Sequence, residues 1–374
     1  MKVMIAAGGT GGHVNPALAV AGEIKKQYPE AEICFVGTPD RIEAKIVPQA
    51  GYPLKTIEIS GFKRGFSPAE IKANIKTVER LLKSSGAVKK IIREFNPDVV
   101  VGFGGYVSGP VVRMAAKMGI PTAIHEQNAY PGVTNKALAE MVDEVMLTVE
   151  AAKEHLKLHK EPIITGLPVR GELLEADPAV SRAELGFDDK PFVLCMGGSL
   201  GADAVNKAII EVVAARHTAD KYNFMISTGQ YGTWVPDELK NRGVDVENNK
   251  RIAVRTYIDD MARCLSAADL VICRAGASSL SEFEALGKPS ILIPSPNVTE
   301  NHQFHNAMAL VNNGAACIIE EKDLTGEKLG ALVDELLADK QHLKTIGDNA
   351  RKMAITDASA KIAGIVTGLI KTHN

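Results

Sequence analysis

The sequence predicts an α/β protein built from two doubly wound, parallel-sheet domains. Short apolar runs rich in β-branched residues alternate with helical patterns along the chain, which is typical of parallel α/β construction. At 374 residues the chain is long for one hydrophobic core, so two domains are expected. A glycine-rich turn also follows the first predicted strand of each half.

The first half contains seven predicted strands, most of them separated by helical patterns. Residues 14–27 form the clearest helical pattern, with Pro16 near the first turn, where its missing N–H costs little. The predicted strands are 2–7, 31–36, 54–59, 97–102, 120–125, 142–148 and 162–165.

The second half begins after a change of character at residues 166–190. This stretch is charged, weakly periodic and interrupted by glycine and proline, which indicates a linker. We therefore expect an N-terminal domain at 1–165 and a C-terminal domain at 166–356. The last predicted helix starts at about 357, has no strand after it, and could pack on either domain, including back on the first. The predicted strands of this half are 191–196, 222–228, 251–256, 270–274, 290–294 and 315–320.

Bulk composition excludes several classes of protein. With 45% apolar residues, 24% charged residues and a net charge of −2, the chain shows no overall sign of nucleic-acid binding. Its five cysteines are odd in number and lack C-x-x-C spacing, so we expect reduced, mostly buried thiols in a cytosolic protein. Residues 3–22 carry no formal charge apart from His13, but glycines, Asn15 and Pro16 break the run. We therefore expect neither a signal peptide nor a membrane span there.

Three glycine-rich turns are the most informative motifs. The first, within Val-Met-Ile-Ala-Ala-Gly-Gly-Thr-Gly-Gly-His at 3–13, is followed by others at 102–106 and 197–202. Missing side chains let backbone N–H groups approach a ligand, and a helix N-terminus favours an anion, so the turns indicate a large phosphorylated ligand. The dinucleotide pattern fails at Val14, where a third glycine is required, and no Gly-Lys-Ser/Thr phosphate loop occurs.

Polar residues gather where other predicted strands end. His13 at a helix start is either satisfied by local backbone or functional and facing an anion site. His-Glu-Gln-Asn follows the strand 120–125, and Arg274 begins a small-residue turn that leads to Glu282. Ser278 or Ser279 could simply cap that helix, although capping and ligand contact can coexist. Since doubly wound domains bind ligands beyond the carboxyl ends of their strands, facing crevices would place the active site in an interdomain cleft.

The sequence shows no metal-binding pattern. No D-x-D occurs, and no His, Cys or Asp spacing resembles a metal site. We therefore expect backbone N–H groups, helix ends and cations such as Arg170 to meet the charge of a diphosphate.

Residues 61–93 carry nine Lys or Arg against Glu70 and Glu79, a net charge of +7. Apolar residues recur there at helical spacing. The region is either a helix with a solvated basic face or a basic amphipathic surface for anionic lipid.

The motifs together resemble the MurG family of peptidoglycan N-acetylglucosaminyltransferases, within glycosyltransferase family 28. The resemblance runs nearly end to end and rests on Gly-Gly-Thr-Gly-Gly-His, Gly-Gly-Tyr-Val-Ser-Gly-Pro, His-Glu-Gln-Asn, Gly-Gly-Ser-x-Gly-Ala and the Ser-Glu segment before Asn-His-Gln. It implies a GT-B fold, no cofactor and no bound metal. It also implies UDP-N-acetylglucosamine as donor and undecaprenyl-pyrophosphoryl-muramoyl-pentapeptide (lipid I) as acceptor, giving lipid II for cell-wall synthesis. The expected location is peripheral, on the cytoplasmic face of the cell membrane against an anionic inner leaflet, with cell-shape and division machinery as partners.

The resemblance also assigns residues. It implies that backbone groups of Ile258 hold the uracil, Glu282 the ribose hydroxyls, and Asn128 and Gln303 the sugar. The phosphates fall to Ser199 and the turn 277–280. The implied donor residues are Thr10, Gly11, Gly12, Asn128, Arg170, Ser199, Ile258, Ala277, Ser278, Ser279, Leu280, Ser281, Glu282 and Gln303, and the acceptor-side residues are Gly104, Gly105 and Tyr106.

The reaction that the resemblance implies inverts the anomeric centre as the acceptor 4-hydroxyl attacks C1. His13 is the first candidate for the base and Glu126 the second, and the first glycine turn belongs to the acceptor side. His302 departs from the glutamine that some relatives carry, which leaves a sugar contact open. A UDP-sugar 2-epimerase on the same fold and a non-catalytic nucleotide-sugar-binding subunit are the alternatives.

Overall fold

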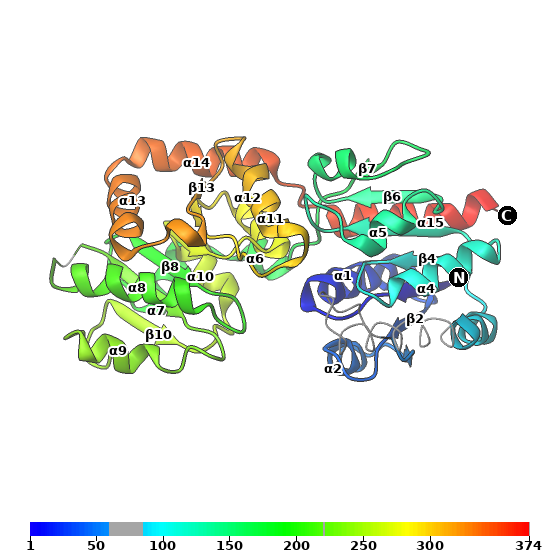
Figure 1. Ribbon diagram of the computed structural model, residues 1–374, viewed down its shortest axis with the longest axis horizontal. Coiled ribbons are helices and arrows are strands. Elements are labelled where there is room, and N and C mark those ends of the chain that lie inside the picture. Colours follow the sequence, from blue (N-terminus) through cyan, green and yellow to red (C-terminus); the bar gives the residue numbers. More distant parts are fainter. Residues whose placement is uncertain (60–84, 220, 374) are drawn as a thin grey trace, which may run out of the picture. The chain divides into compact units, whose positions relative to one another are not determined.

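A computed structural model describes residues 1–59, 85–219 and 221–373. The chain divides into two compact units, which are described separately (Figure 1). Unit 1 comprises Met1–Pro168 and Ile355–Asn374, and unit 2 comprises Val169–Ala354.

Unit 1 is built on a seven-stranded parallel sheet of order β3-β2-β1-β4-β5-β6-β7. Every strand predicted for the first half is present; the central strands are apolar runs that the sheet buries, whereas the edge strands β3 and β7 are short and only partly buried. The strands are β1 Lys2–Ala6, β2 Glu32–Gly37, β3 Leu54–Thr56, β4 Val99–Gly102, β5 Thr122–Glu126, β6 Glu144–Leu147 and β7 Ile163–Ile164. Strand order reverses between β1 and β4, so their carboxyl ends flank the topological switch point of this unit.

Helices cover both faces of this sheet. Val3 and Ile5 pack toward α1 and α15, and Met4 and Ala6 pack toward the other face, as alternation along a strand requires. The helices are α1 Gly11–Gln27, α2 Glu43–Gln49, α4 Ser108–Lys117, α5 Val133–Leu138 and α15 Ala358–His373, with a 3₁₀ turn η1 Glu150–His155 and helical residues 85–95.

Helix α1 starts three residues earlier than predicted. Thr10 is the N-cap and Gly11 the first helical residue, so His13 lies inside the first turn and Pro16 falls in the second. Pro16 therefore leaves the carbonyl of Gly12 without its helical donor, at a residue that is exposed to solvent. Buried residues at helical spacing overcome this cost by packing on the sheet.

The last helix returns to unit 1. Helix α15 packs against α1, and Ile362, Ala363 and Val366 are fully buried in the same core (Figure 1). By length and hydropathy, Lys340–Ile370 resembles a membrane-spanning helix, among the residues that the structure describes. The chain leaves the helical conformation between Met353 and Ala358, however, and α15 is a core helix.

Unit 2 repeats the architecture with a six-stranded parallel sheet of order β10-β9-β8-β11-β12-β13. All strands predicted for the second half are present, and the switch point lies between β8 and β11. The strands are β8 Phe192–Met196, β9 Asn223–Ser227, β10 Ile252–Arg255, β11 Leu270–Cys273, β12 Ser290–Leu292 and β13 Cys317–Ile318.

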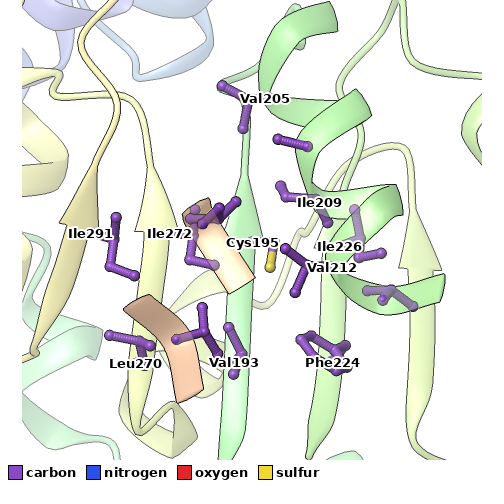
Figure 2. Close-up of a cluster of buried hydrophobic side chains, with 14 of the residues drawn as sticks. Val193, Cys195, Val205, Ile209, Val212, Phe224, Ile226, Leu270, Ile272 and Ile291 are labelled. Atoms are coloured by element: carbon purple, nitrogen blue, oxygen red, sulfur yellow. The ribbon is translucent and has the colours of Figure 1, made fainter. Parts of the chain in front are cut away.

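Apolar side chains fill both faces of this second sheet. Figure 2 shows one face, where Val193 and Cys195 of β8 and Ile272 of β11 pack under Ile209 and Val212 of α8. The helices of the unit are α6 Gly171–Glu175, α7 Pro178–Leu185, α8 Asp203–Arg216, α9 Val235–Asn241, α10 Met261–Ala267, α11 Ala277–Leu286, α12 His302–Val311, α13 Gly326–Ala338 and α14 Lys340–Met353, with 3₁₀ turns η2 His217–Ala219, η3 Thr299–Asn301 and η4 Glu321–Asp323.

The predicted linker at 166–190 is wrong for most of its length. Helices α6 and α7 occupy it, and α7 packs on α10 of unit 2. The basic stretch predicted at 61–93 lies outside the described residues as far as 84, while 85–93 belong to a helix. The five cysteines are free, with four buried and Cys317 half-buried.

Candidate functional site

Two glycine turns meet at the switch point of unit 1. A Cβ on Gly105 would lie 2.2 Å from the carbonyl oxygen of Gly8, and Gly105 has a φ of +77°. Only glycine allows this backbone approach. The turns that follow β1 and β4 are therefore in direct contact.

His13 lies over the second of these turns. A Cβ on Gly104 would lie 2.7 Å from His13 Cδ2 and 3.0 Å from Nε2, so the missing side chain makes room for the imidazole. His13 Nδ1 lies 3.1 Å from Thr10 Oγ1. When Nδ1–H donates to that hydroxyl, Nε2 carries a lone pair and can accept a proton. The structure thus brings together Thr10, His13 and Gly104, while Tyr106 is exposed.

Ser108 anchors the second turn, and motif-based reasoning had not singled it out. This fully buried serine lies at the start of α4, with Oγ 2.8 Å from the carbonyl oxygen of Ala6 and 2.7 Å from that of Gly104. Its oxygen also accepts the Gly104 N–H at 3.1 Å. One hydroxyl therefore connects the end of β1 to the turn after β4.

Glu126 is saturated with hydrogen bonds. Its carboxylate is 2% exposed. Oε1 accepts from the N and Nδ2 of Asn128, at 2.9 and 3.1 Å. Oε2 accepts from Gly132 N at 3.1 Å and Asn135 Nδ2 at 2.8 Å. Each carboxylate oxygen already accepts two hydrogen bonds from the protein, so this geometry favours His13 over Glu126 as the candidate base.

His125, the neighbour of Glu126, is fully buried and neutral. Its Nε2–H donates to the carbonyl oxygen of Gly166 at 2.9 Å, and its Nδ1 accepts from Gln127 Nε2 at 3.1 Å. Burial lowers the pKa of His125 to about 4. The ring also stacks on Phe103, with centroids 5.5 Å apart. His125 therefore connects β5 to the segment that follows β7.

In unit 2 the third glycine turn packs on the loop that follows β9. A Cβ on Gly201 would lie 2.4 Å from the carbonyl oxygen of Thr228, and one on Gly229 would lie 2.0 Å from Gly201 N. Both glycines have positive φ. This contact holds Ser199 exposed at the end of β8.

Helix α11 begins at the other side of the switch point without a side-chain cap. Its N-cap is Gly276, and no side chain bonds the first-turn N–H groups. Ser278 and Ser279 lie inside the first turn, so the alternative in which one of them is the N-cap is wrong. An uncapped helix start beside a switch point is suited to an anion such as phosphate.

Arg170 and Glu282 form an ion pair near that helix start. Arg170 Nε lies 2.9 Å from Glu282 Oε1, although 112 residues separate them. Burial raises the pKa of Glu282, and the Arg170 charge opposes that shift. The structure thus places two predicted donor residues in contact. Within the described ranges, no three His, Cys, Asp or Glu side chains cluster as a metal site would require.

The remaining predicted donor residues lie around the next strand ends. Gln303 Oε1 accepts the Ser295 N–H at 2.9 Å. Ile258 is only 1% exposed. His302 Nδ1–H donates to the carbonyl oxygen of Thr299 at 2.8 Å, which turns that nitrogen toward its own loop. The preceding Glu300 has a φ of +54°, a strained conformation for a residue that is not glycine.

Glu284, on the inner side of α11, makes stability depend on pH. Burial raises its pKa to about 8. The folded state binds this proton more tightly than the unfolded state does. The proton's contribution to the free energy of unfolding is therefore fully present below the unfolded pKa and is lost as pH rises through 8. We expect Glu284→Gln to leave stability almost unchanged at pH 5 and to raise it by up to about 4 kcal/mol at pH 9, measured by chemical unfolding.

The control for this variant is Glu247→Gln, at an exposed glutamate. That change should alter the free energy of unfolding equally at both pH values. A gain for Glu284→Gln that did not grow between pH 5 and pH 9 would contradict the prediction.

Comparison with known proteins gives a consistent result across the chain. Residues 3–147 match the glycosyltransferase family 28 N-terminal domain, and residues 192–362 match the glycosyltransferase family 28 C-terminal domain. A relative from Bacillus cereus is 44% identical over 99% of this chain and 100% of its own length. It is named UDP-N-acetylglucosamine–N-acetylmuramyl-(pentapeptide) pyrophosphoryl-undecaprenol N-acetylglucosamine transferase 1.

Solved structures agree with that likeness. MurG from Acinetobacter baumannii is 30% identical with a TM-score of 0.79, covering 98% of this chain and 99% of its own. A UDP-GlcNAc 2-epimerase from Neisseria meningitidis, bound to UDP-GlcNAc, has a TM-score of 0.65 at 14% identity, covering 98% of this chain and 100% of its own. At that identity the epimerase shares the fold alone.

Proposed function

The chain belongs to glycosyltransferase family 28, and from that premise we propose that it transfers N-acetylglucosamine from UDP-N-acetylglucosamine to the muramoyl sugar of a lipid-linked muramoyl-pentapeptide. The observation that carries this proposal is 44% identity over the full length of a relative named for that reaction. The product of the transfer is the lipid-linked disaccharide-pentapeptide used in peptidoglycan synthesis.

Most of the donor residues lie in unit 2, while Thr10, Gly11, Gly12 and Asn128 belong to unit 1. Glu282 holds the ribose hydroxyls, the backbone of Ile258 holds the uracil, and Gln303 contacts the sugar. The third glycine turn with Ser199 and the uncapped start of α11 receive the phosphates. The Arg170 guanidinium supports this assignment, since its charge opposes the rise in the Glu282 pKa that burial causes and so favours the charged form that accepts two hydroxyls.

The acceptor half falls to unit 1. The acceptor 4-hydroxyl attacks C1 of the donor sugar with inversion while UDP leaves, and His13 Nε2 takes the hydroxyl proton. The contact with Thr10 and the saturation of Glu126 support this choice of base. General-base catalysis supplies about 10²–10⁴-fold, so a larger share must come from orienting the substrates and stabilising the departing diphosphate.

The acceptor lipid also sets the location. An enzyme acting on an undecaprenyl-linked sugar meets its substrate at a membrane, so the chain acts as a peripheral membrane protein. We place it on the cytoplasmic face, against an anionic lipid surface and with the cell-shape and division machinery as partners; the net charge of +7 in the sequence 61–93 supports this location.

The test is incubation of the purified protein with UDP-N-acetylglucosamine and a short-chain lipid I analogue. We expect a lipid-linked disaccharide and stoichiometric UDP, measured by mass spectrometry and chromatography. Free sugar and UDP without disaccharide would favour the 2-epimerase. Binding of UDP-N-acetylglucosamine without any product would favour a non-catalytic subunit.

A further inference from the structure

Glu43 is a fully buried carboxylate at the start of α2. Its Oε2 accepts the Gly9 N–H at 3.0 Å, and its Oε1 accepts the backbone N–H of Thr38 at 3.0 Å and the Thr38 hydroxyl at 2.7 Å. Gly9 belongs to the turn after β1, and Thr38 follows β2. One side chain therefore joins two neighbouring strand ends at the edge of the sheet that carries His13.

The space around Glu43 is shaped by two glycines. A Cβ on Gly8 would lie 2.5 Å from Glu43 Oε1, and a Cβ on Gly37 would lie 2.6 Å from Glu43 Cγ. Any larger residue at either position would displace the carboxylate. Gly8 of the first turn is thus a glycine because Glu43 packs against it, and not only because a bound phosphate would need the space.

The bond from Gly9 determines where the next helix starts. Gly9 has a φ of +90°, and its N–H points back into the protein toward Glu43. The next residue, Thr10, caps α1 and lies 3.1 Å from His13 Nδ1. Glu43 therefore anchors the backbone one residue before the group that orients the imidazole.

A carboxylate fits this position better than an amide. All three partners are donors, and a carboxylate offers acceptor oxygens on both sides. Glutamine would turn an NH₂ group toward either Gly9 N–H or the Thr38 donors, and one N–H would be left unsatisfied in a buried place. The same bond removes the Gly9 N–H from the set that could bind an anion.

We propose that Glu43 is a positioning residue for His13, holding the first glycine turn so that the imidazole stays over Gly104. This inference rests on the proposed function for its kinetic meaning. Displacing a catalytic group by about 1 Å can cost 10²-fold in rate, which sets the scale of the expected loss.

Asp143 offers a matched control within the same unit. Its carboxylate accepts the Thr122 backbone N–H at 2.7 Å and the Thr122 hydroxyl at 3.1 Å. Those are the same kinds of bond that Glu43 makes with Thr38, but Thr122 begins β5, at the opposite end of the sheet. Asp143→Asn therefore measures how much stability and activity change when a similar carboxylate anchor is lost at a place that is not connected to the His13 turn.

The experiment compares Glu43→Gln with Asp143→Asn. For Glu43→Gln we expect kcat to fall about 10–100-fold, with UDP affinity within about twofold of wild type, because the residues assigned to the uracil, the ribose and the phosphates lie in unit 2. Asp143→Asn should lower the melting temperature similarly and leave kcat within about twofold. Equal kcat losses in the two variants would overturn the proposal.

A second readout does not depend on activity. Nitrogen NMR of the His13 imidazole, assigned with His13→Gln, should shift or broaden in Glu43→Gln and stay unchanged in Asp143→Asn. An unchanged His13 signal in Glu43→Gln would overturn the proposal, whereas a wild-type protein that makes no disaccharide would instead overturn the proposed function. Should Glu43→Gln not fold, Thr38→Ala removes one of the three bonds, and a smaller shift of the same signal is expected.

Discussion

We expect the replacement of His13 by alanine to lower turnover by about 10²–10⁴-fold and to leave UDP affinity within several-fold of wild type. The loss follows from the position of the imidazole, with Nδ1 beside Thr10 Oγ1 and the Nε2 edge over Gly104. Affinity for UDP is spared because Glu282, Arg170 and the start of α11 belong to unit 2. The measurements are kcat with a lipid I analogue and UDP binding by calorimetry.

The control for His13 is His217→Ala. His217 Nδ1 bonds the carbonyl oxygen of Ala214 at 2.8 Å, a local contact three residues away like that between His13 and Thr10. It lies at the end of α8 in unit 2, and its replacement should leave kcat within about twofold. A loss of UDP binding in His13→Ala would reassign His13 to the donor.

Glu282→Gln is expected to weaken UDP binding by about 10–100-fold, since a charged acceptor of two ribose hydroxyls is replaced by a neutral amide. The effect should vanish when 2′,3′-dideoxy-UDP is the ligand, because that analogue lacks the hydroxyls. The measurement is a double-mutant cycle of UDP affinities with the two proteins and two ligands.

Glu172→Gln is the matched control. Glu172 also approaches Arg170, at 3.6 Å, but its side chain is 65% exposed, so its charge is well solvated. We expect UDP affinity within about twofold of wild type for this variant. An equal penalty for UDP and the dideoxy analogue in Glu282→Gln would show that Glu282 acts on something other than the ribose.

The strands could be predicted because each buried strand of a parallel sheet is a local apolar run. The prediction of a linker at 166–190 was wrong because local helix signals in that stretch were not recognised. Asp177 caps α7 by accepting from the N–H groups of Ala179 and Val180, Pro178 is its first residue, and Gly186 ends it with a φ of +74°. These residues are the start and stop signals of a short helix, although the same residue types also occur in linkers.

Among the candidate site residues, contacts between residues close in sequence could be predicted better than contacts between residues far apart. Thr10 and His13 lie three residues apart at the start of one helix, so their contact is local. Glu126 looked like a possible base because a carboxylate at a strand end usually meets a ligand. Its four donors come from the loop and helix that follow, and their convergence could not be inferred from composition. Its role in the reaction stays a prediction, and the geometry supports His13.

The sequence alone determined the two parallel sheets, the positions of the three glycine turns and the family, because these depend on patterns within a few residues or on motifs in order along the chain. Only the tertiary structure decided that α15 packs on unit 1, that Arg170 pairs with Glu282 across 112 residues, and that Glu43 bonds Gly9 across 34. The reason is physical. A buried polar group takes whichever partner the folded backbone brings within about 3 Å, and local sequence does not record that partner.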